Sequence, residues 1–118
     1  AMFDLRQFDI TQFEASAARA AKLLRALSNE RRLMVLCQLA DGELSVGQLA
    51  SLVGLSQSAL SQHLAVLREE GIVATRREAQ TIWYRIADPA ALKVVATLGE
   101  IFCPPTREMR RDNKTDQS

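Results

Sequence analysis

Residues 45–70 read SVGQLASLVGLSQSALSQHLAVLREE, and this stretch determines the fold. Ser45 is a good N-cap for a first helix, which Gly54 ends after about two turns. Ser56 caps a second, longer helix that ends near Glu70. Because a three-residue Gly-Leu-Ser corner joins the two helices, the stretch predicts a helix-turn-helix arrangement.

The segments on either side extend this pattern. Apolar residues recur at helical spacing before the stretch, and β-branched and aromatic residues after it alternate as in a short hairpin. Asp88-Pro89 is typical of the start of a helix. The expected elements are helices over 11–27, 30–40, 46–53, 57–70 and 88–103, and strands over 72–77 and 81–86.

The element order predicts a mainly α winged helix-turn-helix fold with a small β-hairpin. A chain of 118 residues, 47% hydrophobic and 25% charged, fits one compact domain. We place this domain at 11–103, after a flexible N-terminal arm (1–10) and before a polar C-terminal tail (104–118). No apolar run approaches the about 20 residues of a membrane span, and no secretory signal is recognised, so we expect a cytoplasmic protein with no membrane partner.

The composition excludes several classes of function. Two cysteines and one histidine cannot supply a four-ligand zinc site, and the cysteines lack the spacing of a thioredoxin-type motif. No catalytic triad, phosphate-binding loop or carboxylate pair is recognisable, so we expect neither an enzyme nor a cofactor. The formal charge is only +1, so nucleic-acid binding must be argued from local placement.

The helix over 57–70 has a polar outer face. Leu60, Leu64 and Leu67 share the buried face, which leaves Ser58 and Gln62, with Ser61 alongside, on the opposite side. Glutamine can pair with adenine in the major groove, and serine can donate to base edges or phosphates. The alternative is a merely solvated helix face, but the helix-turn-helix and the following basic hairpin favour binding to double-stranded DNA.

The hairpin resembles a wing that meets the DNA backbone. Ile82, Tyr84 and Ile86 alternate onto one face and are expected to pack inward. Basic residues near the tip are expected to contact phosphate, and the alternative is that they are ordinary solubility charges. His63 is expected to pack or to contact phosphate. The complete set of expected DNA-binding residues is Ser56, Gln57, Ser58, Ser61, Gln62, His63, Arg76, Arg77, Gln80 and Thr81.

The first and last helices carry more apolar surface than one small domain needs. One stripe includes Phe13 and Leu24, and the other includes Leu92, Val95 and Phe102. A symmetric homodimer would cover both stripes and present two recognition helices to successive major grooves. The alternative is that both helices pack on the back of their own domain.

Three segments resemble the ArsR/SmtB family of bacterial repressors: NERRL (29–33), ELSVGQL (43–49) and LSQSALSQHL (55–64). The resemblance covers roughly residues 13–103 and implies a dimer that releases its operator when an inducer binds. Metal sensors of this family carry two cysteines where this chain has Ser45 and Gly47, and the last helix has no histidine. We therefore expect no metal site.

Cys37 and Cys103 resemble the cysteine pair of a sulfide- and redox-responsive subgroup of this family. The resemblance implies that reactive sulfur species or oxidants bridge the two sulfurs, by a disulfide or a longer sulfur chain, and thereby release the operator. A direct disulfide requires Cα atoms about 4.4–6.8 Å apart. The alternatives are inert cysteines in a repressor that responds to a metal or another ligand, or in an activator that displaces a silencer, and an interaction module without DNA binding.

Overall fold

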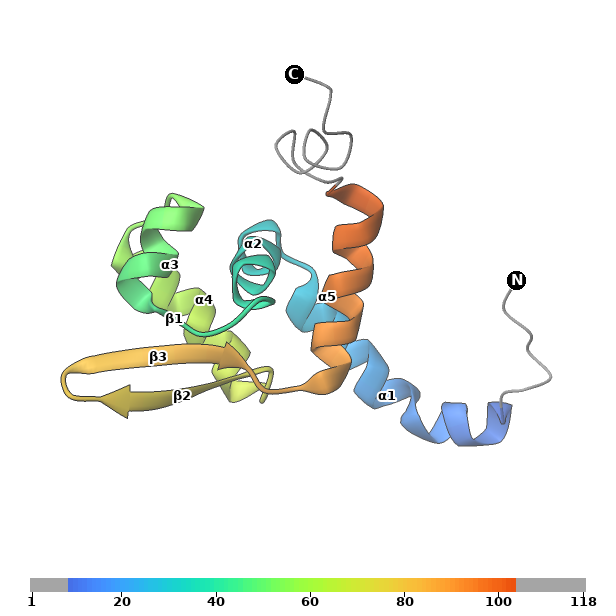
Figure 1. Cartoon of the computed structure of the whole chain (residues 1–118). Coiled ribbons are helices and arrows are strands. Elements are labelled where there is room, and N and C mark those ends of the chain that lie inside the picture. The colour runs from blue at the N-terminus through green and yellow to red at the C-terminus, as the bar shows by residue number, and fades with distance from the viewer. Residues whose placement is uncertain (1–8, 104–118) are drawn as a thin grey trace, which may run out of the picture.

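The computed structural model describes residues 9–103 and has the element order that the sequence predicts, with one addition (Figure 1). The expected tail and all but the last two residues of the expected arm lie outside the described residues. Within them, no helix is long and apolar enough to cross a membrane. The elements are α1 (Ile10–Leu27), α2 (Glu30–Leu39), β1 (Leu44–Ser45), α3 (Val46–Val53), α4 (Gln57–Glu69), β2 (Val73–Glu78), β3 (Thr81–Ile86) and α5 (Pro89–Phe102).

The core is built around α2, as its nearly all-apolar sequence predicts. Val35 and Leu36 are completely buried there. The predicted inner face of α4 is also confirmed, because its three leucines are almost inaccessible. Burial of one leucine side chain stabilises the folded state by about 1.5–3 kcal/mol. This packing fixes the rotation of α4 and turns its polar face outward.

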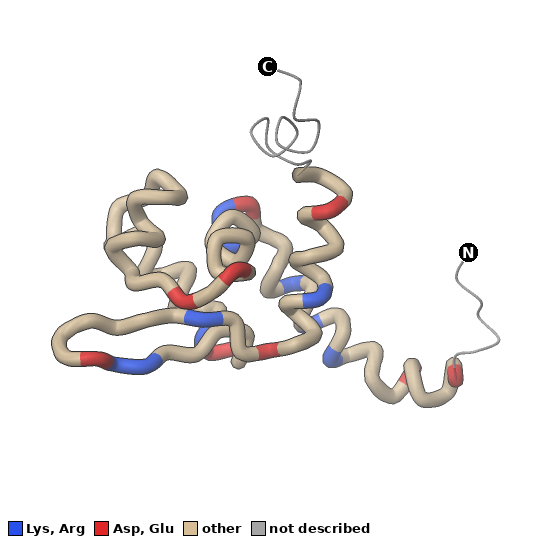
Figure 2. Tube along the Cα trace, in the orientation of Figure 1, with Lys and Arg blue, Asp and Glu red and all other residues tan. Residues whose placement is uncertain are grey.

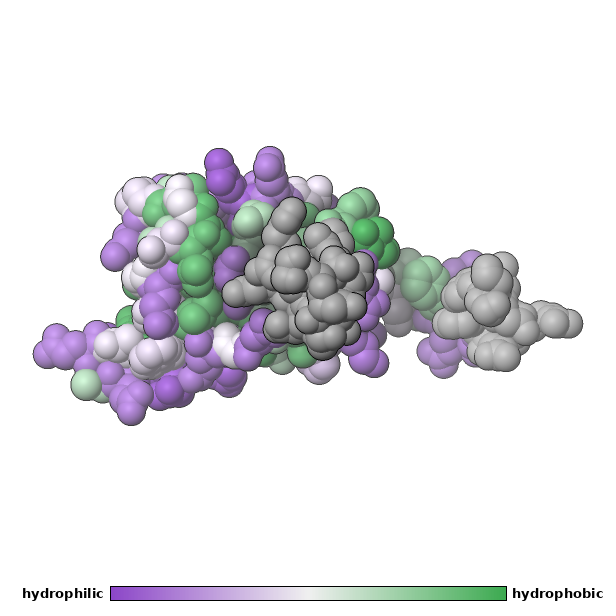
Figure 3. Space-filling model, turned by 45° about the horizontal axis from the view of Figure 1, so that its top comes forward, coloured by the Kyte–Doolittle hydropathy of each residue, from purple (hydrophilic) through white to green (hydrophobic). Residues whose placement is uncertain are grey.

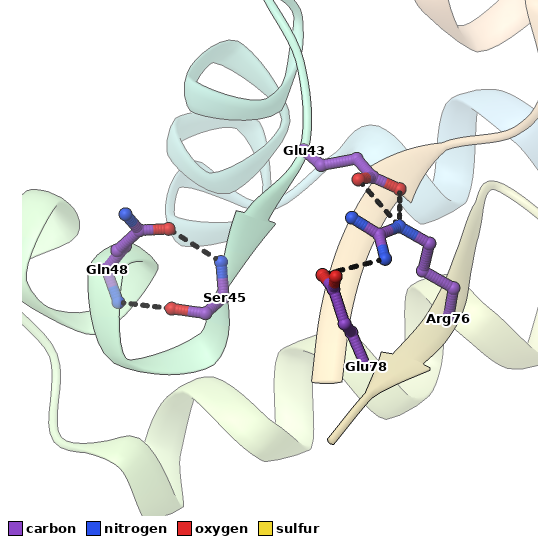
Figure 4. A network of polar contacts seen from close by, with 5 residues as sticks. All are labelled: Glu43, Ser45, Gln48, Arg76 and Glu78. Carbon is purple, nitrogen blue, oxygen red and sulfur yellow. Dashed lines mark hydrogen bonds and ion pairs between the residues drawn. The ribbon is translucent and has the colours of Figure 1, made fainter. Parts of the chain in front are cut away.

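Local capping sets the ends of the helices. The Ser45 hydroxyl accepts a hydrogen bond from the Gln48 backbone N–H at 3.2 Å, and the Ser45 backbone N–H donates to the Gln48 side chain at 2.9 Å (Figure 4). This reciprocal capping box satisfies two N–H groups that the first turn of α3 leaves free. Gly54 closes α3 with a φ of 72°, a left-handed conformation that costs glycine little. The short α3 therefore begins and ends where the sequence predicts.

The sheet has three strands, in the order β1-β3-β2, where the sequence predicted two. The additional strand, β1, pairs antiparallel with β3, with Leu44 opposite Tyr84. The hairpin turn also differs from the prediction: Glu78 pairs with Thr81, so the turn holds two residues rather than three. Ala79 adopts a φ of 56° there. The expectation of a longer loop was wrong because no glycine or asparagine marks this tight turn.

The helices at the two ends of the chain occupy the side opposite the hairpin tip. In Figure 1, α5 stands beside α2, whereas α1 leaves the body of the domain and points away from the hairpin. Asp9 caps α1, and its carboxylate accepts a hydrogen bond from the Gln12 backbone N–H at 3.2 Å. Only the last turn of α1 contains buried residues, Ala26 and Leu27. Most of α1 is therefore exposed in the single chain.

Candidate functional site

The outer face of α4 is a continuous polar surface. Ser58, Ser61 and Gln62 are all exposed, and Gln57 begins the helix with an exposed side chain. The helix is held from below by its buried leucines, so these side chains are presented on a rigid element. The arrangement provides hydroxyl and amide groups of the kind that read base edges in the major groove.

Two further predicted residues of α4 have structural constraints. The Ser56 hydroxyl accepts a hydrogen bond from the Ala59 backbone N–H at 3.1 Å and so caps the helix. Its proton remains available to an acceptor outside the protein. His63 is half-buried at the flank of the leucine face.

The guanidinium of Arg76 is held by two carboxylates. Its Nε donates to both oxygens of Glu43, at 2.9 and 3.0 Å, and its Nη1 donates to Glu78 at 3.2 Å (Figure 4). It also lies 5.6 Å from the centre of the Trp83 ring. These hydrogen bonds to carboxylates raise the pKa of Arg76 above its ordinary value. Arg76 therefore links β2 to the segment that enters β1.

The two adjacent arginines of β2, Arg76 and Arg77, lie on opposite faces of the sheet. Side chains alternate along a strand, so Arg76 shares the outer face with Trp83, its cross-strand neighbour. Arg77 is opposite Ile82 and shares the inner face, on which Tyr84 packs against the helical core. Within residues 9–103, Arg77 has no ion pair. Figure 2 shows acidic and basic residues side by side near the hairpin tip.

The expected inner face of β3 is confirmed in part. Tyr84 and Ile86 pack against the core, whereas Ile82 is half-buried and lies outside the core cluster. The reason is geometric: the tip of the hairpin extends beyond the helices, so Ile82 has no helix to cover it (Figure 1). Gln80 and Thr81, also at the tip, are exposed.

Both cysteines line one pocket between α2 and α5. The pocket has a volume of about 600 Å³, and its wall is mostly apolar. Cys37 lies in the last turn of α2, and Cys103 is the residue that follows the last turn of α5. The side chains of Met34, Val95 and Phe102 line the space with them. Two residues far apart in the sequence thus share one cavity.

The two thiols differ in exposure. Cys37 is half-buried and Cys103 is exposed. Burial raises the pKa of the Cys37 thiol above the ordinary value of 9.0, and the nearby Cys103 raises it further. Cys103 is therefore the more accessible sulfur, while Cys37 is reached through the pocket. Among residues 9–103, no group of His, Cys, Asp and Glu could hold a metal ion.

Beyond this pocket, α1 and α5 expose large apolar side chains. Phe13 is 57% exposed and Leu24 58%, and on α5 Phe102 is 73% exposed. Figure 3 shows apolar surface over the end of α5 and along α1. The expected stripe on α5 is partly satisfied within the chain, because Val95 is buried in the domain's own core.

Comparison with known proteins places this arrangement in a family. The family model described as bacterial regulatory protein, arsR family, matches residues 29–75, from the cap of α2 into β2. The transcriptional activator HlyU of Vibrio cholerae is 48% identical over 80% of this chain and 88% of its own length. The chain belongs to the arsR family. It is a DNA-binding transcriptional regulator, and the expectation that it is not an enzyme is confirmed by the regulators it resembles.

Other arsR-family relatives agree in sequence and in structure. The biofilm growth-associated repressor of Agrobacterium fabrum is 43% identical over 90% of this chain and 91% of its own length. The crystal structure of the repressor BigR from Xylella fastidiosa superposes with a TM-score of 0.77 at 44% identity, covering 83% of this chain and all of that one. Reduced HlyU from V. cholerae gives a TM-score of 0.76 at 49% identity, covering 79% and 98%. The predicted winged helix-turn-helix fold is confirmed.

Proposed function

We propose that this arsR-family protein is a homodimeric repressor that leaves its operator when Cys37 and Cys103 are bridged by reactive sulfur species or oxidants. The observation that carries the proposal is that both cysteines line the same pocket between α2 and α5. The similarity to biofilm growth-associated repressors and to a protein studied as reduced HlyU supports it.

Operator binding in this proposal uses α4 for sequence and the wing for the backbone. Gln62 and Ser58 face the bases, while Ser56, Gln57, Ser61, His63, Gln80 and Thr81 are in positions to reach phosphates at the helix start, the helix flank and the wing tip. Arg76 and Arg77 of β2 have different roles in this proposal. Arg77 supplies the phosphate contact, and Arg76, already bonded to two carboxylates, holds the wing in place.

Dimerisation is proposed through α1 and α5. Burying an apolar side chain such as Phe13 is worth about 1.5–3 kcal/mol relative to leaving it in water. A second copy offers the same stripes in return, since a two-fold interface is self-complementary. The dimer would also set the distance between the two α4 helices, and hence the half-site spacing on DNA.

The bridging reaction requires a thiolate and an electron acceptor. In the first step, the Cys103 thiolate attacks the terminal sulfur of a hydropersulfide RSSH; the S–S bond breaks, RS⁻ leaves, and Cys103 carries an added sulfur. In the second step, the Cys37 thiolate attacks the sulfur attached to Cys103 carbon, and HS⁻ leaves. The two cysteines lose two electrons, and RSSH is reduced to RSH and H₂S. A three-sulfur bridge consumes a second RSSH as the oxidant.

Bridging links two elements with different tasks. Cys37 belongs to the core helix that packs on α3 and α4, and Cys103 ends the proposed dimer helix. A bond between them restricts how α5 sits on α2, and so biases the relative orientation of the two recognition helices. Coupling of this kind is worth about 1–3 kcal/mol, or about 5- to 150-fold in affinity.

A second candidate is a regulator with inert cysteines that responds to a ligand in the same pocket. The mostly apolar wall and the volume of about 600 Å³ favour this alternative over a metal. A further alternative is activation by displacement of a silencer, since HlyU is described as an activator. Both leave the DNA contacts unchanged and differ only in what controls them.

Single cysteine variants separate these candidates. Wild type, Cys37→Ser and Cys103→Ser, all reduced, should bind operator DNA with the same affinity. After treatment with a hydropersulfide, the wild type should lose affinity and both variants should keep it. Release of either variant as complete as that of the wild type would contradict the bridge and favour the inert-cysteine alternative.

A further inference from the structure

A second hollow lies between α4 and the wing, away from the cysteine pocket. It has a volume of about 340 Å³ and is lined by both polar and apolar groups. Five residues of α4 form one wall, and Tyr84 of β3 forms the other. The lining residues are Ser61, Leu64, Ala65, Arg68, Glu69 and Tyr84.

Three hydrogen-bond donors face this hollow without a recorded partner in the part of the chain the structure describes. Arg68 is exposed and makes no ion pair there, in contrast to Arg76. The Tyr84 ring packs against the core, and its hydroxyl makes no side-chain hydrogen bond within residues 9–103. Ser61 contributes an exposed hydroxyl. A guanidinium with two hydroxyl groups suits a phosphate diester, because all three can donate to its oxygens.

We propose that this hollow binds a backbone phosphate of the operator, with Arg68 as the charged contact and Tyr84 and Ser61 as hydrogen-bond donors. The inference rests on the DNA-binding part of the proposed function. It adds a site to that function, since the sequence pattern gave Arg68 and Tyr84 no role in binding DNA.

The path of the DNA supports this site. The major groove is about 12 Å wide and is bounded by sugar–phosphate strands. If α4 lies in the groove and the wing lies outside it, one strand must pass between them. The hollow occupies that position, and Arg77 projects from the same inner face of the hairpin that carries Tyr84. The strand would thus run from Arg68 and Tyr84 toward Arg77.

One residue that lines the hollow, Glu69, disfavours phosphate binding. The carboxylate of Glu69 repels phosphate, and the structure records no ion pair between it and Arg68 among the described residues. Glu69→Gln removes this repulsion without changing the size of the side chain. The site therefore makes opposite predictions for two adjacent residues: loss of Arg68 weakens DNA binding, and neutralisation of Glu69 strengthens it.

The test measures operator affinity of the full-length reduced protein as a function of salt concentration. Arg68→Ala should weaken binding of operator and random DNA by the same factor, about 5- to 30-fold for the two copies in a dimer. It should also lower the slope of log affinity against log salt by about two, one phosphate per subunit. Arg68→Lys should restore the slope, and Tyr84→Phe should weaken binding with the slope unchanged. Arg31→Ala, at an exposed arginine of α2, is the matched control for loss of one charge.

The outcomes are distinguishable. If Arg68→Ala has the slope of the wild type and an unchanged melting temperature, the phosphate site is wrong while DNA binding by α4 stands. Weaker rather than tighter binding by Glu69→Gln would also contradict it. If the wild type itself binds DNA with no salt dependence, both this site and the proposed operator binding fail.

Discussion

The two sides of this small domain expose opposite kinds of surface. On the side of α4 and the wing, the leucines of α4 are buried and most exposed side chains are polar or charged, with Val66 as an exposed apolar exception. On the side of α1 and α5, phenylalanine and leucine side chains are exposed, and the pocket between α2 and α5 holds both cysteines. The first side presents groups that can form hydrogen bonds with a partner. The second side leaves apolar surface uncovered in the single chain.

This difference indicates what each side meets. A polar, rigidly supported helix face is suited to a polar partner such as DNA, and substitutions on it should change binding but not folding. An uncovered apolar face is suited to a second copy of the chain, and substitutions on it should change assembly.

Introducing charge on α1 should have the largest effect. Phe13→Asp removes apolar burial from both halves of the proposed dimer, at a cost of about 3–6 kcal/mol for the pair. Sedimentation should show a monomer, and operator affinity should fall with it. Leu52→Ser, which changes a comparably exposed leucine on α3, is the control and should leave the dimer intact. If the Phe13→Asp protein is still a dimer, the proposal that α1 forms part of the interface is wrong.

Within α4, two residues close in sequence should separate folding from binding. Leu64 is 1% exposed, so Leu64→Ala should lower the free energy of unfolding by about 2–5 kcal/mol in urea titrations. Gln62→Ala, on the exposed face, should change the free energy of unfolding by no more than about 0.5 kcal/mol. Similar unfolding curves for the two variants would contradict the orientation assigned to α4.

Gln62→Ala should instead affect sequence recognition. Loss of a good bidentate contact to a base costs about 1–3 kcal/mol of discrimination per subunit. Operator affinity should fall while affinity for random DNA stays the same, as measured by competition binding. An equal loss for both DNA types would assign Gln62 to the backbone rather than to a base.

Substitution of Arg76 and of Arg77 should change the salt dependence of operator binding differently. Arg77→Ala should reduce the salt dependence of operator binding, because it removes a phosphate contact from each subunit. Arg76→Ala should leave the salt dependence unchanged and weaken binding by loosening the wing, and Glu43→Gln should reproduce its effect. If Arg76→Ala lowers the salt slope as much as Arg77→Ala, Arg76 contacts the DNA directly.

The two thiols should react at different rates. Alkylation by iodoacetamide should label the exposed Cys103 before Cys37 in mass spectra of the reduced protein. Because burial raises the pKa of Cys37, its thiolate fraction at pH 8 is smaller than that of an ordinary thiol. Its rate should therefore keep rising as the pH passes 9.0. Faster labelling of Cys37 at pH 7 would contradict the burial seen in the structure.

The sequence predicts local features of this fold well. The boundaries of α3 follow from Ser45 and Gly54, whose capping contacts span only a few residues. By contrast, β1 was missed because its two residues become a strand only by pairing with Trp83 and Tyr84, far along the chain. The ion pair between Arg76 and Glu43 is non-local in the same way, and for this reason the sequence assigned Arg76 to DNA.

The candidate sites show the same limit. Periodicity identifies the outer face of α4, because one helix contains both the buried leucines and the exposed polar residues. No spacing rule could bring Cys37 and Cys103 into one pocket; that expectation came from the family resemblance. The hollow at Arg68 also needed the structure, because its second wall comes from β3.

The central claim is that a covalent bridge between Cys37 and Cys103 controls operator binding. The most direct measurement follows the mass of the protein and the fraction of operator bound in the same samples, over a titration with hydropersulfide. The account predicts a peptide pair linking Cys37 and Cys103, by a disulfide or with added sulfur, whose abundance rises in proportion to the operator released. Complete bridging with the operator still bound, or release with both thiols unmodified, would contradict it.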